Sequence, residues 1–117
     1  MTRYIDTCQY IIIDMDDRQF QKIAKALADP RRFEIFQTIT KATDADGLCC
    51  GQVCEKMPVA QATVSHHLKE LTEAGLLEPR SEGQFRFWSI KTEVMNEYIA
   101  ELQSRLQLFP TTASKKN

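Results

Sequence analysis

The stretch of sequence that most constrains the fold is QATVSHHLKELTEAG, which ends at Gly75. Val64, Leu68 and Leu71 recur in it at positions i, i+4 and i+7, which places them on one stripe of an α-helix. Glycine is the residue that most often ends a helix, so Gly75 marks the end of this one. The pattern predicts a helix that opens near Ala60, with one buried face and one exposed face.

Two short β-strands are expected directly after this helix. Leu76–Arg80 and Phe85–Ile90 favour strands, and the SEGQ segment between them contains Gly83, which suits a tight turn. The remaining segments are predicted to be helices, and Asp29 and Pro30 suit the start of the second one. Their apolar stripes consist of Phe20, Ile23, Ala24 and Leu27; of Phe33, Ile35, Phe36 and Ile39; of Val53 and Met57; and of Val94, Met95, Tyr98, Ile99, Leu102 and Leu106.

The order of these elements is that of a winged helix-turn-helix fold. A short helix, a tight turn and a second helix precede the hairpin, and further helices lie on either side. The 117 residues suffice for one domain with one core. We expect a mainly α fold with a β-hairpin, divided into an N-terminal arm (1–14), a winged helix-turn-helix domain (15–109) and a disordered tail (110–117).

Charge and composition exclude some classes of protein and leave others open. The formal net charge of −1 argues neither for nor against nucleic-acid binding, because the placement of the basic residues matters more. The longest apolar run, YIII at Tyr10–Ile13, is far too short to cross a membrane, and the N-terminus lacks the apolar core of a signal peptide. We therefore expect a cytoplasmic protein without a membrane partner, in which clustered thiols indicate metal or redox chemistry rather than disulfides.

The outer face of the helix around residues 61–73 suits DNA recognition. Small, polar and basic side chains fit a major groove, where hydroxyls and amides bond to base edges and lysine meets phosphate. The hairpin arginines are expected to reach the DNA backbone or minor groove. The candidate DNA-binding residues are Gln61, Thr63, Ser65, His66, Lys69, Arg80 and Arg86. The alternative is a solvated helix and hairpin, and His67, on the flank of the apolar stripe, is expected to pack rather than to contact DNA.

Three segments, LADPRRFEIF, TVSHHLKELTEAGLL and EGQFRFWSI, resemble the ArsR/SmtB family of metal-responsive transcriptional repressors. The resemblance covers about Phe20 to Leu106. It implies a homodimer that pairs through its first and last helices, occupies double-stranded operator DNA when metal-free and leaves it when metal binds. Two positions depart from the family pattern: Ala60 stands where a serine often caps the recognition helix, and Gln84 stands where arginine is common in the wing.

The stretch LCCGQVC holds three of the four cysteines. It resembles the LCVCDLC stretch of arsenic- and cadmium-responsive family members, with Cys49 and Cys54 at the outer positions, Cys50 displaced, and Gly51 where the second family cysteine stands. Thiolates select soft ions, and trivalent arsenic or antimony needs only three sulfurs, whereas zinc needs four ligands. The candidate inducer is therefore As(III) or Sb(III) held by Cys49, Cys50 and Cys54. The alternative for the cluster is three small buried apolar side chains.

Helix geometry limits how these thiols meet. On a regular helix Cys50 and Cys54 lie about 40° apart, but Cys49 and Cys54 lie about 140° apart. All three bind one ion only if the chain unwinds near Gly51 or if Cys49 precedes the helix. We also expect thiols at a helix start to ionise more readily. Cys8 is a further candidate ligand, from the partner chain, which would favour Cd(II) or Pb(II); the alternative for Cys8 is a free thiol.

Three other functions remain open on the same residues. A thiol redox switch would release DNA when a cysteine is oxidised. A protein-interaction module would keep the fold without binding DNA. A thiol enzyme is not expected, because the chain has no Cys-x-x-Cys dithiol and no histidine near the cysteines to act as a base, and no organic cofactor is expected either.

Overall fold

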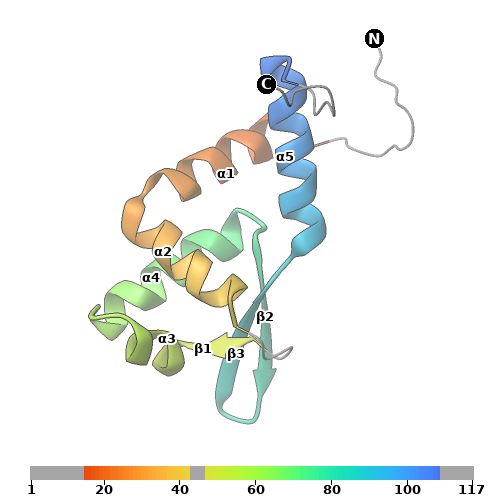
Figure 1. The fold of residues 1–117 in the computed structure, drawn as a ribbon. Helices are drawn as coiled ribbons and strands as arrows, with labels where there is room; N and C mark the ends of the chain where they lie inside the picture. The colour runs from red at the N-terminus through yellow and green to blue at the C-terminus, as the bar shows by residue number, and fades with distance from the viewer. Residues whose placement is uncertain (1–14, 43–46, 109–117) are drawn as a thin grey trace.

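The computed structural model describes residues 15–42 and 47–108. The elements follow the order α1 (Asp17–Ala28), α2 (Pro30–Thr40), β1 (Leu48–Cys49), α3 (Cys50–Lys56), α4 (Gln61–Glu73), β2 (Leu77–Glu82), β3 (Phe85–Ile90) and α5 (Thr92–Leu106). Helices α1 and α5 lie at one end of the molecule, and α3, β1 and the β2–β3 hairpin lie at the other (Figure 1). The predicted winged helix-turn-helix fold is confirmed. The expected arm, 1–14, and tail, 110–117, lie outside the described residues.

The apolar stripe of α4 lies at the centre of the core. Val64, Leu68 and Leu71 are fully buried, as their spacing predicted. They pack with Ile23 of α1 and Ile35 of α2 in one cluster. Burial of each of these valine, leucine and isoleucine side chains stabilises the fold by about 1.5–3 kcal/mol. The core therefore fixes which side of α4 faces outward.

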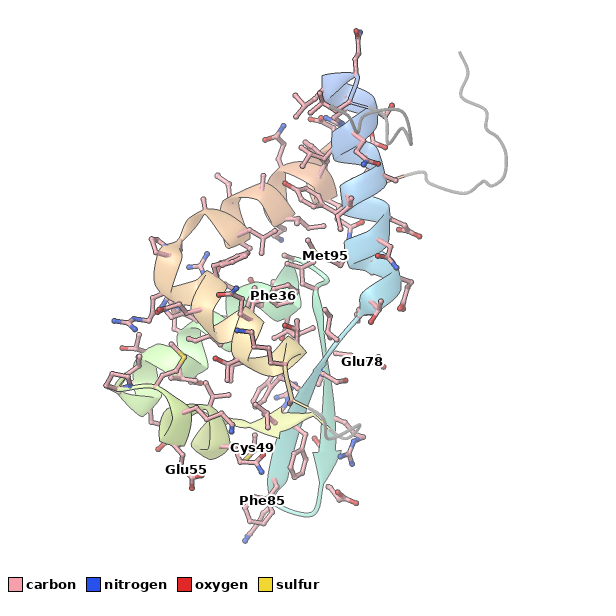
Figure 2. All side chains as sticks on the ribbon, in the orientation of Figure 1. Phe36, Cys49, Glu55, Glu78, Phe85 and Met95 are labelled. Atoms are coloured by element: carbon pink, nitrogen blue, oxygen red, sulfur yellow. The ribbon has the colours of Figure 1, made fainter. Side chains whose placement is uncertain are left out.

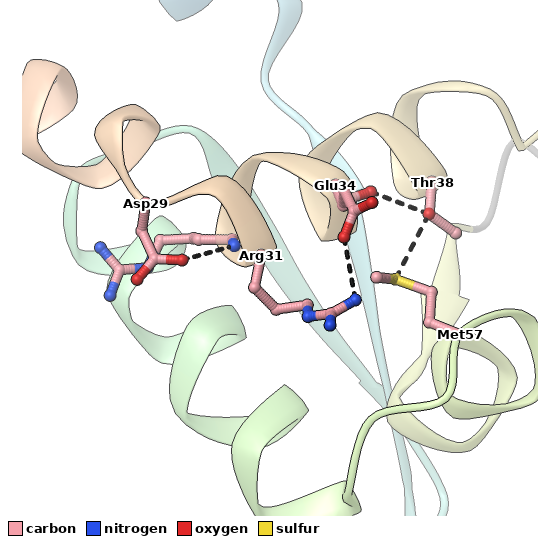
Figure 3. Close-up of polar contacts among 6 residues, drawn as sticks. Asp29, Arg31, Glu34, Thr38 and Met57 are labelled. Atoms are coloured by element: carbon pink, nitrogen blue, oxygen red, sulfur yellow. Dashed lines mark hydrogen bonds and ion pairs between the residues drawn. The ribbon is translucent and has the colours of Figure 1, made fainter.

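The start of α2 follows the prediction, but one member of its stripe does not. Asp29 precedes the helix, and its side chain accepts a hydrogen bond from the Arg32 amide at 3.0 Å, with Pro30 in the first turn (Figure 3). Phe33, predicted to be on the apolar stripe, is exposed. It lies about 160° around the helix from the buried Ile35, so both side chains cannot face the same core.

The sheet contains a strand that was not predicted. Its order is β1–β3–β2, and β1 pairs antiparallel with β3, with Leu48 opposite Trp88 and Cys49 opposite Phe87. Two residues are too few to show a period, so only the tertiary pairing reveals this strand. The hairpin turn is also tighter than expected, because Ser81 and Glu82 extend β2.

Helices α1 and α5 meet through aromatic and ionic contacts. The ring of Phe20 lies 5.1 Å from that of Tyr98, centroid to centroid, and the Arg105 guanidinium lies 3.9 Å over the Phe20 ring. Arg105 also forms ion pairs with Asp17 at 2.7 Å and Glu101 at 2.9 Å. Both aromatic side chains are buried within the chain itself. No helix within residues 15–42 and 47–108 is long and apolar enough to span a membrane.

Gly47 controls how the chain enters β1. Its φ is +89°, and a Cβ at this position would collide with the carbonyl group of Trp88 on β3. Only glycine combines this left-handed conformation with such a close approach at low cost. Gly51, in α3, has no atom within 4 Å of the place where a Cβ would lie.

We predict opposite effects of alanine at these two glycines. Gly47→Ala should lower the free energy of unfolding by roughly 2 kcal/mol or more, from backbone strain and collision with β3. The matched control, Gly51→Ala, should raise it by about 0.5–1 kcal/mol, because alanine favours the helix. Urea unfolding followed by circular dichroism measures both. Equal stability of Gly47→Ala and the unaltered protein would contradict the described entry into β1.

Candidate nucleic-acid interface and thiol cluster

The helix-turn-helix is formed by α3, the turn at residues 57–60 and α4. The Val59 amide donates to the Met57 carbonyl at 2.8 Å inside the turn, and the amides of Thr63 and Val64 both donate to the Ala60 carbonyl at 3.0 Å. Ala60 occupies the N-cap and supplies no side-chain hydrogen bond. The sequence prediction that this helix lacks a side-chain cap is therefore confirmed. The first turn of α4 depends on packing against α3.

The outer face of α4 carries the predicted polar residues. Five candidate contacts are exposed along this helix: Gln61, Thr63, Ser65, His66 and Lys69. The buried stripe on the other side holds them in this orientation. The face can donate and accept hydrogen bonds and carries one lysine, which is what base reading and phosphate contact require. Their contact with DNA stays a prediction.

The hairpin presents its two arginines on aromatic rings. The Arg80 guanidinium lies 5.0 Å from the centre of the Phe87 ring, and that of Arg86 lies 5.7 Å from the centre of the Trp88 ring. Arg80 also pairs with Glu82 at 3.1 Å. Stacking restricts the motion of each guanidinium and leaves its edge able to meet phosphate. Both candidate residues therefore lie on the wing, as the sequence placed them.

Phe85 is a surface residue that the sequence analysis assigned only to a strand. Its side chain is 56% exposed, and Figure 2 shows it at the end of the hairpin farthest from α5. A large apolar side chain at this position has no core to join. Its place at the start of the second predicted strand, directly after the SEGQ turn, was the available signal, because the end of a hairpin lies away from the core.

Cys49 lies between the sheet and α3. Its backbone is extended, with φ −89° and ψ 168°, and it is the N-cap of α3 (Figure 2). Its amide donates to the Gln52 side-chain oxygen at 2.9 Å, and Cys49 is paired with Phe87 in the sheet. The sequence allowed two ways to bring Cys49 towards the other thiols: unwinding of the chain near Gly51, or a place for Cys49 before the helix. The structure shows the second, and Gly51 remains helical.

Cys50 connects α3 to the recognition helix. Its sulfur lies 3.8 Å from the main-chain carbonyl oxygen of Gln61, to which the thiol donates a weak hydrogen bond. Burial, and then the neighbouring Cys54 thiol, raise the pKa of the Cys50 thiol above its ordinary value. The expectation that the helix start makes this thiol ionise more readily is wrong for Cys50, because desolvation and the neighbouring thiols raise its pKa instead.

The three thiols are ligands of the kind that soft ions prefer, but they do not surround a common binding position in this structure. Cys49, Cys50 and Cys54 are all free and partly buried, and Cys50 and Cys54 interact directly. Within residues 15–42 and 47–108, no group of three or more cysteine, histidine or carboxylate side chains is close enough to hold a metal ion. Binding through all three sulfurs therefore requires the cluster to close. Cys8 lies outside the described residues.

The fold and the exposed α4 face define a winged helix-turn-helix DNA-binding protein, and comparison with known proteins agrees. A family model described as a helix-turn-helix domain matches residues 27–80, from the end of α1 into β2. An uncharacterised HTH-type transcriptional regulator of Bacillus subtilis is 33% identical over 72% of this chain and 82% of its own. An arsenical resistance operon repressor of Staphylococcus xylosus is 31% identical over 73% of this chain and 77% of its own.

A solved structure described as a possible transcriptional regulator for arsenical resistance has a TM-score of 0.59 and 27% identity, covering 72% of this chain and 85% of that one. The chain belongs to the ArsR/SmtB family and is a transcriptional repressor rather than an enzyme. Family membership implies operator DNA as a partner. It leaves the inducing ligand undetermined.

We predict different roles for Lys69 and Ser65 on the outer face of α4. Lys69→Ala should weaken binding to every duplex, because a phosphate contact carries no sequence information. It should also reduce the salt slope, which is the slope of the logarithm of affinity against the logarithm of salt concentration, by about one. Ser65→Ala and Gln61→Ala should instead reduce the preference for operator over random DNA, with the salt slope unchanged. Fluorescence anisotropy at several salt concentrations measures both quantities. A changed sequence preference in Lys69→Ala with an unchanged salt slope would show that the roles are reversed.

Proposed function

We propose that this repressor holds its operator as a homodimer and releases it when trivalent arsenic or antimony binds Cys49, Cys50 and Cys54. One observation carries the proposal: the thiols adjoin both DNA-reading elements. Cys49 is paired with Phe87 of the wing, and Cys50 contacts the carbonyl oxygen of Gln61 at the start of the recognition helix. A ligand at these sulfurs therefore acts on the wing and on α4 together.

The donor set supports a soft, thiol-binding ion. Three thiols lie within six residues, and soft ligands select soft or borderline ions. The interacting pair, Cys50 and Cys54, supplies the first two sulfurs. Cys49 supplies the third from an extended N-cap, where the chain is not held by helical hydrogen bonds on its N-terminal side. Three sulfurs suffice for trivalent arsenic or antimony.

The proposed release mechanism follows from contacts that the thiols make in this structure. A ligating thiol loses its proton, so Cys50 no longer donates to the Gln61 carbonyl. Closure of the cluster draws Cys49 away from its place opposite Phe87. The start of α4 and the base of the wing both lose support. Coupling between ligand and DNA is reciprocal, and values of about 1–3 kcal/mol are usual, which correspond to roughly 5–150-fold in affinity.

The proposed dimer uses the part of α5 that the core leaves open. Ile99 and Leu106 are 43% and 56% exposed, and their i, i+7 spacing places them on one side of the helix. Leu102 lies between them, partly buried. Tyr98 and Phe20, also in the predicted pairing stripes, are buried in their own chain. The proposed interface is therefore narrower on each protomer than the stripe of apolar residues in the sequence suggested.

A redox switch is the second candidate, favoured by the direct interaction of Cys50 with Cys54. Peroxide would oxidise one thiol to a sulfenic acid and release water. Attack by the second thiol would then form a disulfide and release another water. Cysteines four residues apart on a regular helix do not meet disulfide geometry, so α3 would have to distort. The third candidate is a cadmium or lead site that includes Cys8 of the partner chain.

We predict that charge on the exposed stripe of α5 separates the dimer. Ile99→Glu combined with Leu106→Glu should give monomers and reduce operator affinity by about tenfold or more, because two half-sites are no longer bound together. Ser104→Glu, on another side of α5, is the matched control and should remain dimeric. Sedimentation and anisotropy test both properties. A monomeric variant with full operator affinity would exclude the dimer as the binding form.

We predict that each cysteine of the cluster is needed for release but not for DNA binding. Cys49→Ser, Cys50→Ser and Cys54→Ser should each keep operator affinity and lose release by arsenite. A serine hydroxyl at position 50 can still donate to the Gln61 carbonyl, whereas hydroxyls bind soft ions poorly. Cys8→Ser is the matched control and should change little. Anisotropy of a labelled operator during arsenite titration measures release.

The same titration distinguishes the alternatives. If Cys8→Ser is as damaging as Cys54→Ser while Cys49→Ser has no effect, and cadmium or lead releases DNA, the site lies between chains. If peroxide releases DNA and arsenite does not, the redox switch is correct. Persistence of arsenite release in all three cluster variants would contradict every thiol-based proposal.

A further inference from the structure

The recognition helix buries a histidine that the proposed metal response does not use. His67 is 7% exposed and is the one polar or charged side chain in the core of residues 15–42 and 47–108. Its Nδ1 accepts a hydrogen bond from Arg32 Nε of α2 at 3.2 Å. A polar group is buried at low cost only when it is paired, so this bond makes the site tolerable.

The bond belongs to a chain of contacts that begins at the cap of α2. Asp29 accepts from the Arg32 amide at 3.0 Å, and Arg31, beside it, is held by Glu34 at 2.9 Å (Figure 3). Arg32 is therefore fixed at its backbone and directed to α4 through its side chain. Its partner, His67, directly follows His66 of the DNA-facing surface. The contact thus positions the helix at the residues that are expected to read DNA.

The direction of the hydrogen bond requires a neutral imidazole. An Nδ1 that accepts a proton carries none, so the ring proton is on Nε2, and a doubly protonated ring has no acceptor left for Arg32. The charged groups that act on His67 are Asp29, Arg31 and Arg32 of the α2 region and His66 of α4. Protonation would place a second positive charge against the Arg32 guanidinium in a poorly hydrated site.

We propose that Arg32 and His67 are a positioning pair that holds the recognition helix for operator reading, and that protonation of His67 weakens operator binding. The proposal rests on DNA binding through α4 and not on the thiol cluster. Arsenite release can therefore fail without affecting it. Neither residue is proposed to touch DNA, and the effect on binding passes through the orientation of α4.

The sign of the pH effect follows from the burial. Burial, the largest cause, lowers the pKa of His67 below its ordinary value of 6.5, and the nearby Asp29 carboxylate opposes this only in part. The folded, DNA-binding form therefore binds the proton more weakly than a form in which the ring is released to water. The free-energy advantage of this DNA-binding form over the released form is fully present above the ordinary histidine pKa. It is lost as the pH falls from there through the lowered pKa of His67.

The test measures operator affinity between pH 8 and pH 5 at constant ionic strength. The unaltered protein should lose affinity in acid, by up to about tenfold for each unit by which the pKa of His67 differs between the positioned and released forms. His67→Asn places an amide oxygen near the position of Nδ1 and has no titrating group. It should therefore bind within about threefold of the unaltered protein at pH 7.5, since one neutral hydrogen bond is retained, and lose the acid effect. His67→Leu should bind more weakly at every pH.

Two further variants separate positioning from general stability. His66→Asn leaves the bond between Arg32 and His67 in place and should therefore keep the acid loss, whatever its overall affinity. Arg32→Met combined with His67→Leu should cost less than the sum of the single changes, because either change breaks the same bond. Circular dichroism at each pH confirms that the variants are folded, and random duplex controls for sequence-independent binding. If His67→Asn keeps the full acid loss, or if Arg32→Met and His67→Leu are additive, the proposal is overturned.

Discussion

Burial of the apolar stripe of α4 is the constraint on which the rest of the structure depends. Val64, Leu68 and Leu71 are fully enclosed by α1, α2 and the strand that follows. Rotating the helix by one residue position, about 100°, would expose these side chains and bury polar ones, at a cost of several kcal/mol. The outer face is therefore defined by what the inner face must bury. Its polar residues are displayed with little freedom to turn, which is what sequence reading requires.

The thiol cluster shows how two opposing effects on one group are resolved. A helix start favours a thiolate, but burial and an adjacent thiol disfavour it, and at Cys50 the second pair of effects prevails. A protonated Cys50 can donate to the Gln61 carbonyl, so in this structure the thiol connects α3 to the first residue of α4. In the proposed response to a soft ion, this proton leaves when the thiol becomes a ligand, so ligand binding would break the contact with Gln61 through the chemistry of one side chain.

The two contacts that position α4 are of different kinds and lie at different places. At its first residue, a thiol contacts a main-chain carbonyl from α3, and half-way along, His67 accepts from Arg32 of α2. The first depends on thiol chemistry and the second on the protonation of an imidazole. Apolar packing has no preferred direction, so on its own it allows small rotations of α4. Each of these hydrogen bonds has a preferred direction and opposes such rotations. Together they fix α4 in directions that apolar packing alone leaves free.

The sequence alone determined the order of the helices and the hairpin, the inward and outward faces of α4, the cap of α2 and the missing side-chain cap at Ala60. All of these depend on local periods and on residues close in the chain, which a sequence displays directly. Only the tertiary structure revealed the two-residue strand opposite Phe87, the contact of Cys50 with Gln61 and the bond between Arg32 and His67. These partners lie 11 to 40 residues apart in the chain, so no local pattern encodes them. Tertiary packing also decided how much of the α5 stripe the chain uses for its own core, because Tyr98 turns towards Phe20 while Ile99 and Leu106 remain outside.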